Sequence, residues 1–157
     1  MRSPNALQGR VQWHPEGTWK NDPYSKKLFE GGRMAKVWLV LAAASGFLSV
    51  ALGAFGAHSL KTFLDEYGKS IYEKAVIYQM FHTIALFAVG LLQLYFRNTS
   101  FSIAGACFLT GILLFSGSLY VLAITGIKWI GAITPIGGVS FLLGWVFFGL
   151  KIIKAHL

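Results

Sequence analysis

Charge is scarce in this sequence: Asp, Glu, Lys and Arg make up 13% of its 157 residues, whereas a soluble domain carries about 25%. The six acidic residues all lie outside the long apolar runs, so no paired carboxylates for acid–base catalysis stand inside those runs. The single cysteine, Cys107, excludes an internal disulfide, and Cys and His show no zinc-binding spacing. Walker and dinucleotide-binding motifs are absent as well. The sequence therefore predicts no enzymatic activity and no resident cofactor or metal.

Hydrophobic residues, in contrast, make up 55% of the chain, and the mean hydropathy is +0.57. They are concentrated in four nearly uncharged runs of about 20 residues, the length that an α-helix needs to cross a ~30 Å hydrocarbon core. These runs do not alternate as the strands of a membrane β-barrel do. The sequence therefore predicts an all-α integral membrane bundle of four transmembrane helices, near residues 37–57, 75–96, 101–124 and 129–150.

The connectors between the predicted spans differ in character. Residues 97–100 and 125–128 are short enough only for antiparallel hairpins. Residues 59–67 place Leu60 and Leu64 on one helical face and charged residues on the other, and Gly68 stands where a helix would end. This pattern predicts a short amphipathic helix in the membrane interface. Pro135 is expected to kink the fourth span, because it removes a backbone hydrogen bond.

Residues 1–33 differ in composition from the rest of the chain. They are polar, rich in Gly and Pro, and show no helical or strand periodicity, which is typical of a disordered tail. Met34 is followed by Lys36 and then by the first apolar run. We therefore expect a four-helix transmembrane domain at 34–157, with residues 1–33 a candidate for an over-long gene start.

Lysine and arginine residues near the spans divide between the two sides of the membrane. The side with both termini carries Lys20, Lys26, Lys27, Arg33, Lys36, Arg97, Lys151 and Lys154, and the other carries Lys61, Lys69, Lys74 and Lys128. Because cytoplasmic loops are enriched in these residues, both termini are predicted to be cytoplasmic. A chain that starts at Met34 has four lysine or arginine residues on each side, so its sequence predicts the orientation only weakly. The net charge of +8 thus indicates contact with anionic lipid, and we expect no nucleic-acid partner.

A few polar side chains lie inside the predicted spans. Gln79 and His82 share one helical face of the second span, and His58 closes the first span. Ionisable residues in a membrane are functional candidates by default, but a hydrogen bond that joins two helices is the simpler hypothesis. We expect Gln79 and His82 to contact the third span near Ser116 or Ser118. The different depths of His58 and His82 argue against a shared metal or haem.

Small residues recur along the predicted spans. Ser45, Ser49, Gly53 and Ala57 repeat every four positions in the first span, and the third and fourth spans are rich in glycine. Small residues let helix backbones approach closely within a membrane. Besides the lipid bilayer, the expected partners are a second copy of the chain or another membrane protein, bound through these Gly-rich helices.

Five short motifs follow one another along the predicted spans. They are 53–58 (GAFGAH) with Leu60, 78–79 (YQ) with His82, 115–120 (FSGSLY), 134–138 (TPIGG), and 144–145 (GW). In this order and spacing they resemble the small bacterial YgdD-like membrane proteins, the family of domain of unknown function 423, to which the vertebrate transmembrane protein 256 is related. The resemblance covers 34–151, about three-quarters of the chain. It implies a small multi-span protein of the bacterial plasma (inner) membrane and implies no activity.

Two hypotheses of function follow from these patterns. The first is a non-enzymatic accessory or scaffold protein that packs against partners through its Gly-rich helices. The second is a small transporter or channel, in which several copies of the chain surround the polar face formed by Gln79 and His82. A pore needs several copies, because one four-helix bundle has little room for it.

Overall fold

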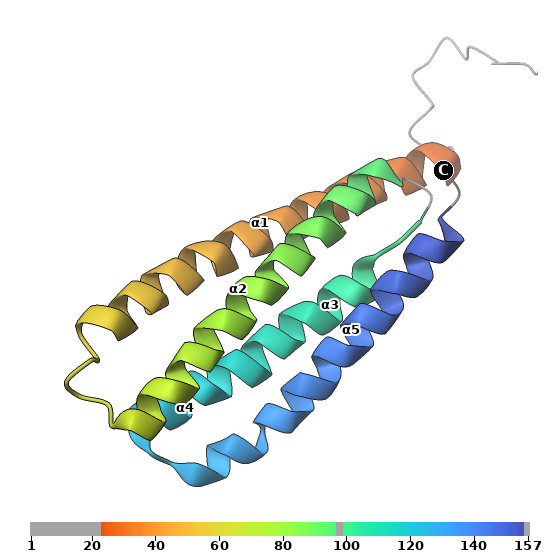
Figure 1. Cartoon of the computed structure of the whole chain (residues 1–157). Coiled ribbons are helices and arrows are strands. Elements are labelled where there is room, and N and C mark those ends of the chain that lie inside the picture. Colours follow the sequence, from red (N-terminus) through yellow and green to blue (C-terminus); the bar gives the residue numbers. More distant parts are fainter. Residues whose placement is uncertain (1–22, 97–98, 156–157) are drawn as a thin grey trace, which may run out of the picture.

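The computed structural model describes residues 23–96 and 99–155, with side chains described from Glu30 onward. Within these residues the chain is helical apart from short connectors (Figure 1). The elements are α1 (Pro23–His58), α2 (Glu66–Tyr95), α3 (Ser102–Gly111), the π-helical turn η3 (Ile112–Ser116), α4 (Gly117–Thr125), the 3-10 turn η4 (Lys128–Ala132) and α5 (Thr134–Lys154).

Four segments of the described chain are long and apolar enough to cross a membrane. They are Glu30–His58, Glu66–Tyr95, Ser102–Thr125 and Lys128–Lys154. The prediction of four membrane-spanning helices is thus confirmed. The second span begins nine residues before the predicted residue 75, so His82 lies close to the midpoint of its helix.

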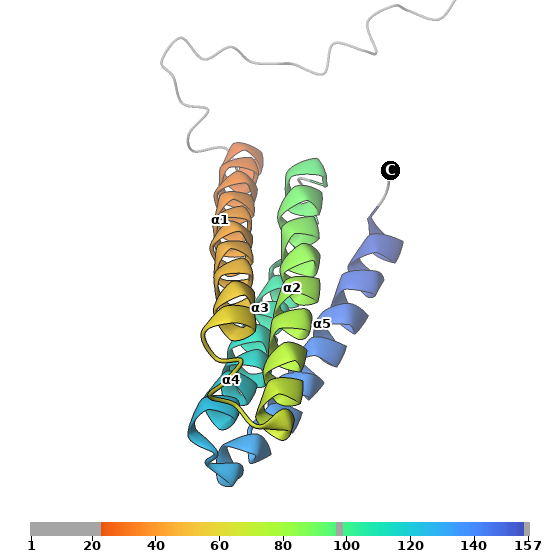
Figure 2. The same cartoon turned by 60° about the vertical axis from the view of Figure 1, so that its left-hand side comes forward.

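The spans lie side by side, with α1 and α5 at opposite edges (Figure 1, Figure 2). The backbone of α1 packs on α2, α2 packs on α3, η3 and α4, and α5 packs on α3 and η3. The described start of α1 and the end of α5 lie at one end of the bundle (Figure 1). One apolar cluster, around Phe101, Phe108 and Trp38, lies nearer that end. A second cluster, around Tyr72 and Leu119, lies nearer the other end.

The helix α1 begins eleven residues before Met34, the predicted start of the transmembrane domain. Residues 23–33, which we expected to belong to the polar tail, form the first turns of α1, and Pro23 is the first residue of that helix. Proline is tolerated there because the first helical N–H groups have no intrahelical partner. The remainder of the predicted tail, 1–22, lies outside the described residues.

The predicted amphipathic helix at 59–67 is not a separate helix. Residues 59–65 form turns, with the backbone N–H groups of Phe63 and Leu64 both donating to the carbonyl of Leu60. Leu60 and Leu64 are nevertheless buried, so the apolar face was identified correctly. The carboxylate of Asp65 accepts a hydrogen bond from the backbone N–H of Gly68 and caps the start of α2. This N-cap begins a new helix where Gly68 was expected to end one.

The third and fourth spans each contain an irregular turn. In the third span, η3 separates α3 from α4. In the fourth span, η4 precedes α5, and Pro135 lies in the first turn of α5. We expected a kink at Pro135, but the interruption comes before it, since proline in a first turn displaces no intrahelical hydrogen bond.

Glycines of the third and fourth spans pack against aromatic residues of the same chain. A Cβ atom at Gly105 would lie 2.9 Å from the ring of Trp38, and one at Gly144 would lie 2.7 Å from the ring of Phe108. Gly111 lies in the same way against the ring of Phe141 in α5. The predicted close approach of helices through glycine is therefore present, and it joins helices within one chain.

Gly137 brings the backbones of two helices close together. A Cβ atom at this position would overlap the backbone nitrogen and Cα of Phe115 in η3. Backbone atoms cannot move aside as a flexible side chain can. Only glycine therefore lets α5 lie this close to the π-helical turn.

We predict that Gly137→Ala lowers the stability of the bundle by about 1–3 kcal/mol, the usual cost of overpacking. Gly138→Ala is the matched control, because its Cβ would lie 3.7 Å from the ring of Phe115, an ordinary contact. Unfolding of both variants in one mild detergent is the measurement. Equal stability of Gly137→Ala and Gly138→Ala would contradict the close contact between α5 and η3.

Candidate functional site

Gln79 is the centre of a hydrogen-bonded network between three spans. Its side chain is only 4% exposed. Its amide Nε2 donates to the backbone carbonyl of Ser45 in α1 over 3.1 Å, and its Oε1 accepts from the hydroxyl of Tyr120 in α4 over 2.8 Å. Both ends of the amide are therefore paired inside the hydrocarbon region, where an unpaired polar group is costly.

A second contact between α1 and α2 lies one helical turn from Gln79. The hydroxyls of Ser45 and Thr83 are 2.6 Å apart and both side chains are buried. We refer to Ser45, Gln79, Thr83 and Tyr120 as the polar network. The sequence identified Ser45 only as a small residue of the α1 seam and Tyr120 only as part of a motif. Their hydrogen-bonding roles depend on which helix faces meet, and spacing along the chain does not reveal this.

His82 lies on the same face of α2 but points toward α5. Its Nδ1 is 2.8 Å from the carbonyl oxygen of Tyr78, and its Nε2 is 3.3 Å from the indole Nε1 of Trp145. A carbonyl only accepts and an indole N–H only donates, so Nδ1 must carry the proton and Nε2 the lone pair. The two bonds together fit a neutral imidazole in one tautomer.

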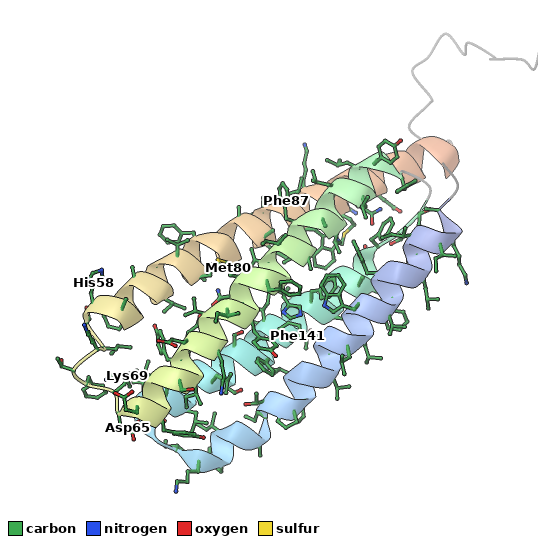
Figure 3. The ribbon with its side chains drawn as sticks, in the orientation of Figure 1. His58, Asp65, Lys69, Met80, Phe87 and Phe141 are labelled. Atoms are coloured by element: carbon green, nitrogen blue, oxygen red, sulfur yellow. The ribbon has the colours of Figure 1, made fainter. Side chains whose placement is uncertain are left out.

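The imidazole of His82 also stacks on an aromatic ring. The ring centroids of His82 and Phe141 are 3.4 Å apart and the planes differ by 7°. Phe141 projects from α5 in the middle of the bundle (Figure 3). The surrounding aromatic cluster consists of Tyr78 and Phe81 of α2, Phe108 of α3, Phe115 of η3, and Phe141 and Trp145 of α5.

The structure separates the five polar residues that the sequence singled out. We expected Gln79 and His82 to contact Ser116 or Ser118. This prediction is wrong for Gln79 and for His82. Ser118 donates to the carbonyl of Phe115 and pairs with Thr134, while the buried hydroxyl of Ser116 has no partner among the described residues.

His58 is exposed at the end of α1, well away from Phe141 in the bundle (Figure 3). Within 23–96 and 99–155, no three His, Cys, Asp or Glu side chains lie close enough together to hold a metal ion. Gln79, His82 and His58 therefore belong to three separate environments, the polar network, the aromatic cluster and the end of α1, and the two serines lie outside all three.

A cavity of about 610 Å³ lies beside His82, between α2 and α5; we call it the α2–α5 groove. Backbone packing is close between α1 and α2 and between α3 and α5, whereas α2 and α5 meet through aromatic side chains. The groove is lined by Ile77, Tyr78, Phe81, His82, Phe115, Gly138, Phe141, Leu142 and Trp145. Each of these residues lies in the middle third of its span.

The fold and these contacts define a class of protein: a small helical membrane protein whose interior polar groups join its own four spans. The family described as "Protein of unknown function (DUF423)" matches residues 52–138, more than half of the chain. The chain therefore belongs to the DUF423 family. The resemblance noted from the five motifs is thereby confirmed.

Relatives from several bacteria are similar to the chain over most of their length. A UPF0382 membrane protein of Haemophilus influenzae is 49% identical over 114 residues, 72% of this chain and 90% of the relative. The UPF0382 membrane protein YwdK of Bacillus subtilis is 40% identical over 120 residues, 76% of this chain and 98% of the relative. No solved structure matches the chain. These relatives identify a bacterial multi-pass membrane protein of an uncharacterised family.

We predict that Gln79→Leu lowers the stability of the bundle by about 1–3 kcal/mol, because it leaves buried groups of α1 and α4 unpaired. Tyr120→Phe removes one of the same bonds and should cost about 0.5–1.5 kcal/mol. The double variant should lose less than the sum of the two, since the variants share that bond.

Unfolding of the four proteins in one detergent measures this coupling. Tyr95→Phe is the matched control, because Tyr95 is 71% exposed and lies on the same helix. Strict additivity of Gln79→Leu and Tyr120→Phe would show that the hydrogen bond between them contributes nothing.

Proposed function

We propose that the chain is a non-enzymatic accessory protein of the bacterial plasma membrane, which binds a second copy or another membrane protein through the outer face of α1. The observation that carries this proposal is the uneven burial of the spans. Only 22% of the most apolar window of the first span and 17% of that of the fourth are buried, compared with 44% in each of the second and third. The first span thus presents most of its surface to lipid or to a partner.

The outer face of α1 combines small and large apolar residues. Ala44, Ala51 and Ala54 are exposed, and the exposed side chains of Val40 and Phe47 lie on the same stripe. Spacings of three and four residues keep all five on one side of a helix. Alternating small and large residues suit close packing of two helices in a membrane.

The glycines that face the bundle from the third and fourth spans, in contrast, are not available to a partner. Gly105, Gly111, Gly137 and Gly144 are covered by atoms of the same chain. The partner surface that the sequence placed on these helices is therefore better assigned to α1. These four glycines are already used in packing the bundle.

The interior polar groups support a structural rather than a catalytic role. Gln79 has both ends of its amide paired, and His82 has both ring nitrogens within hydrogen-bonding distance of a partner. A transporter in which copies surround these residues needs them to face a shared pore. Both are only 4% exposed inside their own bundle, so this alternative has less support.

We predict that the parent chain, purified in mild detergent, has a native mass above the 17.2 kDa of one chain, and that Ala51→Trp abolishes the larger species. A bulky indole on the outer face of α1 prevents close helix packing. Val139→Trp on the lipid-exposed side of α5 is the control and should retain the larger species. A parent protein of single-chain mass, or a complex unchanged by Ala51→Trp, would contradict the proposal.

Both termini are proposed to lie in the cytoplasm. Among the described residues, the end of the bundle with the start of α1 and the end of α5 carries Arg33, Lys36, Lys151 and Lys154, and the opposite end carries Lys61, Lys69, Lys74 and Lys128. Lys69 pairs with Glu66 over 2.8 Å. The proposed orientation therefore depends on the further Lys and Arg residues near the N-terminus and at Arg97.

We predict that a membrane-impermeant thiol reagent added to intact cells labels Lys69→Cys and leaves Lys154→Cys unlabelled, in a Cys107→Ala background. After the cells are opened, both variants should react, which controls for access to each thiol. Labelling of Lys154→Cys alone in intact cells would reverse the orientation. Labelling of both would contradict an even number of spans.

A further inference from the structure

The α2–α5 groove opens toward the hydrocarbon core of the membrane. All of its lining residues lie in the middle third of their spans, and Phe81, Leu142 and Trp145 are exposed along it. Its volume of about 610 Å³ lies within the range of small-molecule sites, roughly 300–1,000 Å³. A molecule that enters the groove must therefore dissolve in the bilayer.

The walls of the groove are mainly aromatic. The rings of Tyr78 and Phe115 have centroids 4.5 Å apart, and those of Phe81 and Trp145 have centroids 5.7 Å apart. Flat rings on both sides favour a flat guest, because aromatic rings stack with offset or tilted geometry. A saturated acyl chain would gain only apolar contact from the same walls.

Tyr78 gives the groove a hydrogen-bond donor. Its side chain is 42% exposed, and its hydroxyl makes no hydrogen bond with any other described residue. An unpaired hydroxyl in hydrocarbon is costly, so an acceptor brought by a ligand would be favourable there. Phospholipid ester groups lie at the membrane interface, and the middle of an acyl chain carries no acceptor. The Tyr78 hydroxyl therefore favours a ligand that is wholly lipid-soluble and carries a hydrogen-bond acceptor on its ring.

The π-helical turn η3 brings Phe115 to this groove. Single π-helical turns occur frequently at functional sites, because they change the direction of side chains within a helix. Ser116, the next residue of the turn, is 1% exposed and has a hydroxyl without a partner among the described residues. The turn that supplies Phe115 to the groove therefore also holds an unsatisfied buried group, although Ser116 does not itself line the groove.

From these observations we propose that the α2–α5 groove binds an isoprenoid quinone. The quinone ring lies among the rings of Tyr78, Phe115 and Trp145, and one ring carbonyl accepts the hydroxyl of Tyr78. The isoprenoid tail extends from the groove into the bilayer. None of the residues that line this site belongs to α1, and the proposal does not rest on the proposed function.

Gly138 supplies the variant that closes the groove. A Cβ atom there would lie 3.7 Å from the ring of Phe115, so a side chain can start without a clash and extend into the cavity. Gly149, on the same helix, has no atom within 4 Å of a built Cβ and lies outside the groove. Gly138→Leu and Gly149→Leu are therefore a matched pair.

The test is a titration of the full chain in phospholipid nanodiscs with ubiquinone-2, followed by quenching of tryptophan fluorescence. The parent and Gly149→Leu should bind saturably, and Gly138→Leu should lose binding. If Gly138→Leu does not fold, Leu142→Phe serves as the blocking variant, because Leu142 is 67% exposed and lines the groove. Non-saturable quenching, or saturable binding that survives the folded blocking variant, overturns the proposal.

Tyr78→Phe tests the hydrogen bond without changing the ring. It should weaken ubiquinone-2 binding roughly two- to tenfold, the usual effect of one hydrogen bond, while Tyr95→Phe leaves binding unchanged. Oleic acid as competitor separates a ring-specific site from a general acyl-chain groove. Unchanged affinity in Tyr78→Phe, or displacement of ubiquinone-2 by an equal concentration of oleic acid, overturns the assignment of a quinone.

Discussion

The hydrocarbon environment makes an unpaired polar group between helices costly, and the amide of Gln79 is paired at both ends with other spans of the chain. It bonds to a backbone carbonyl of α1 and to the hydroxyl of Tyr120 in α4. Because hydrophobic burial gives little preference among apolar helices in lipid, such directional contacts determine which faces meet. The pairing of Ser45 with Thr83 acts in the same direction. The polar network therefore fixes the rotation of α1 against α2 and of α2 against α4.

Once these faces are fixed, glycine and aromatic residues determine how closely the helices approach. Rings of Phe141, Phe108 and Trp38 lie directly against glycines of neighbouring helices. Each such contact substitutes dispersion attraction for the missing hydrophobic driving force. Gly137 goes further, because it brings α5 against the backbone of η3. The Gly-rich spans thus stabilise the folded chain, and the outer face of α1 remains for other interactions.

Bilayer thickness and helix geometry made four spans predictable from run length alone, since ~20 apolar residues match the hydrocarbon core. The sequence also identified Gln79 and His82 as buried polar groups in need of partners. It did not identify the hydrogen-bond partner of His82. A serine hydroxyl was expected, whereas the indole N–H of Trp145 donates to the imidazole. Nor could it predict η3, because the extra residue of that turn is accommodated by Gly137 from a distant helix. At Asp65, the N-cap signal outweighed an amphipathic pattern of only nine residues.

The same packing explains why a groove remains between α2 and α5. Gly137 holds α5 against η3, so α5 follows the third span and meets α2 only through long aromatic side chains. The stacked rings of His82 and Phe141 fill the inner part of the gap and leave its lipid-facing part open. Filling that part by a larger side chain from α5 would require replacing Gly138 or enlarging Leu142, and neither change meets a backbone clash. Gly138 thus keeps the groove open at a position where an added Cβ would make only ordinary contact, which is the arrangement expected of a site that admits a ligand.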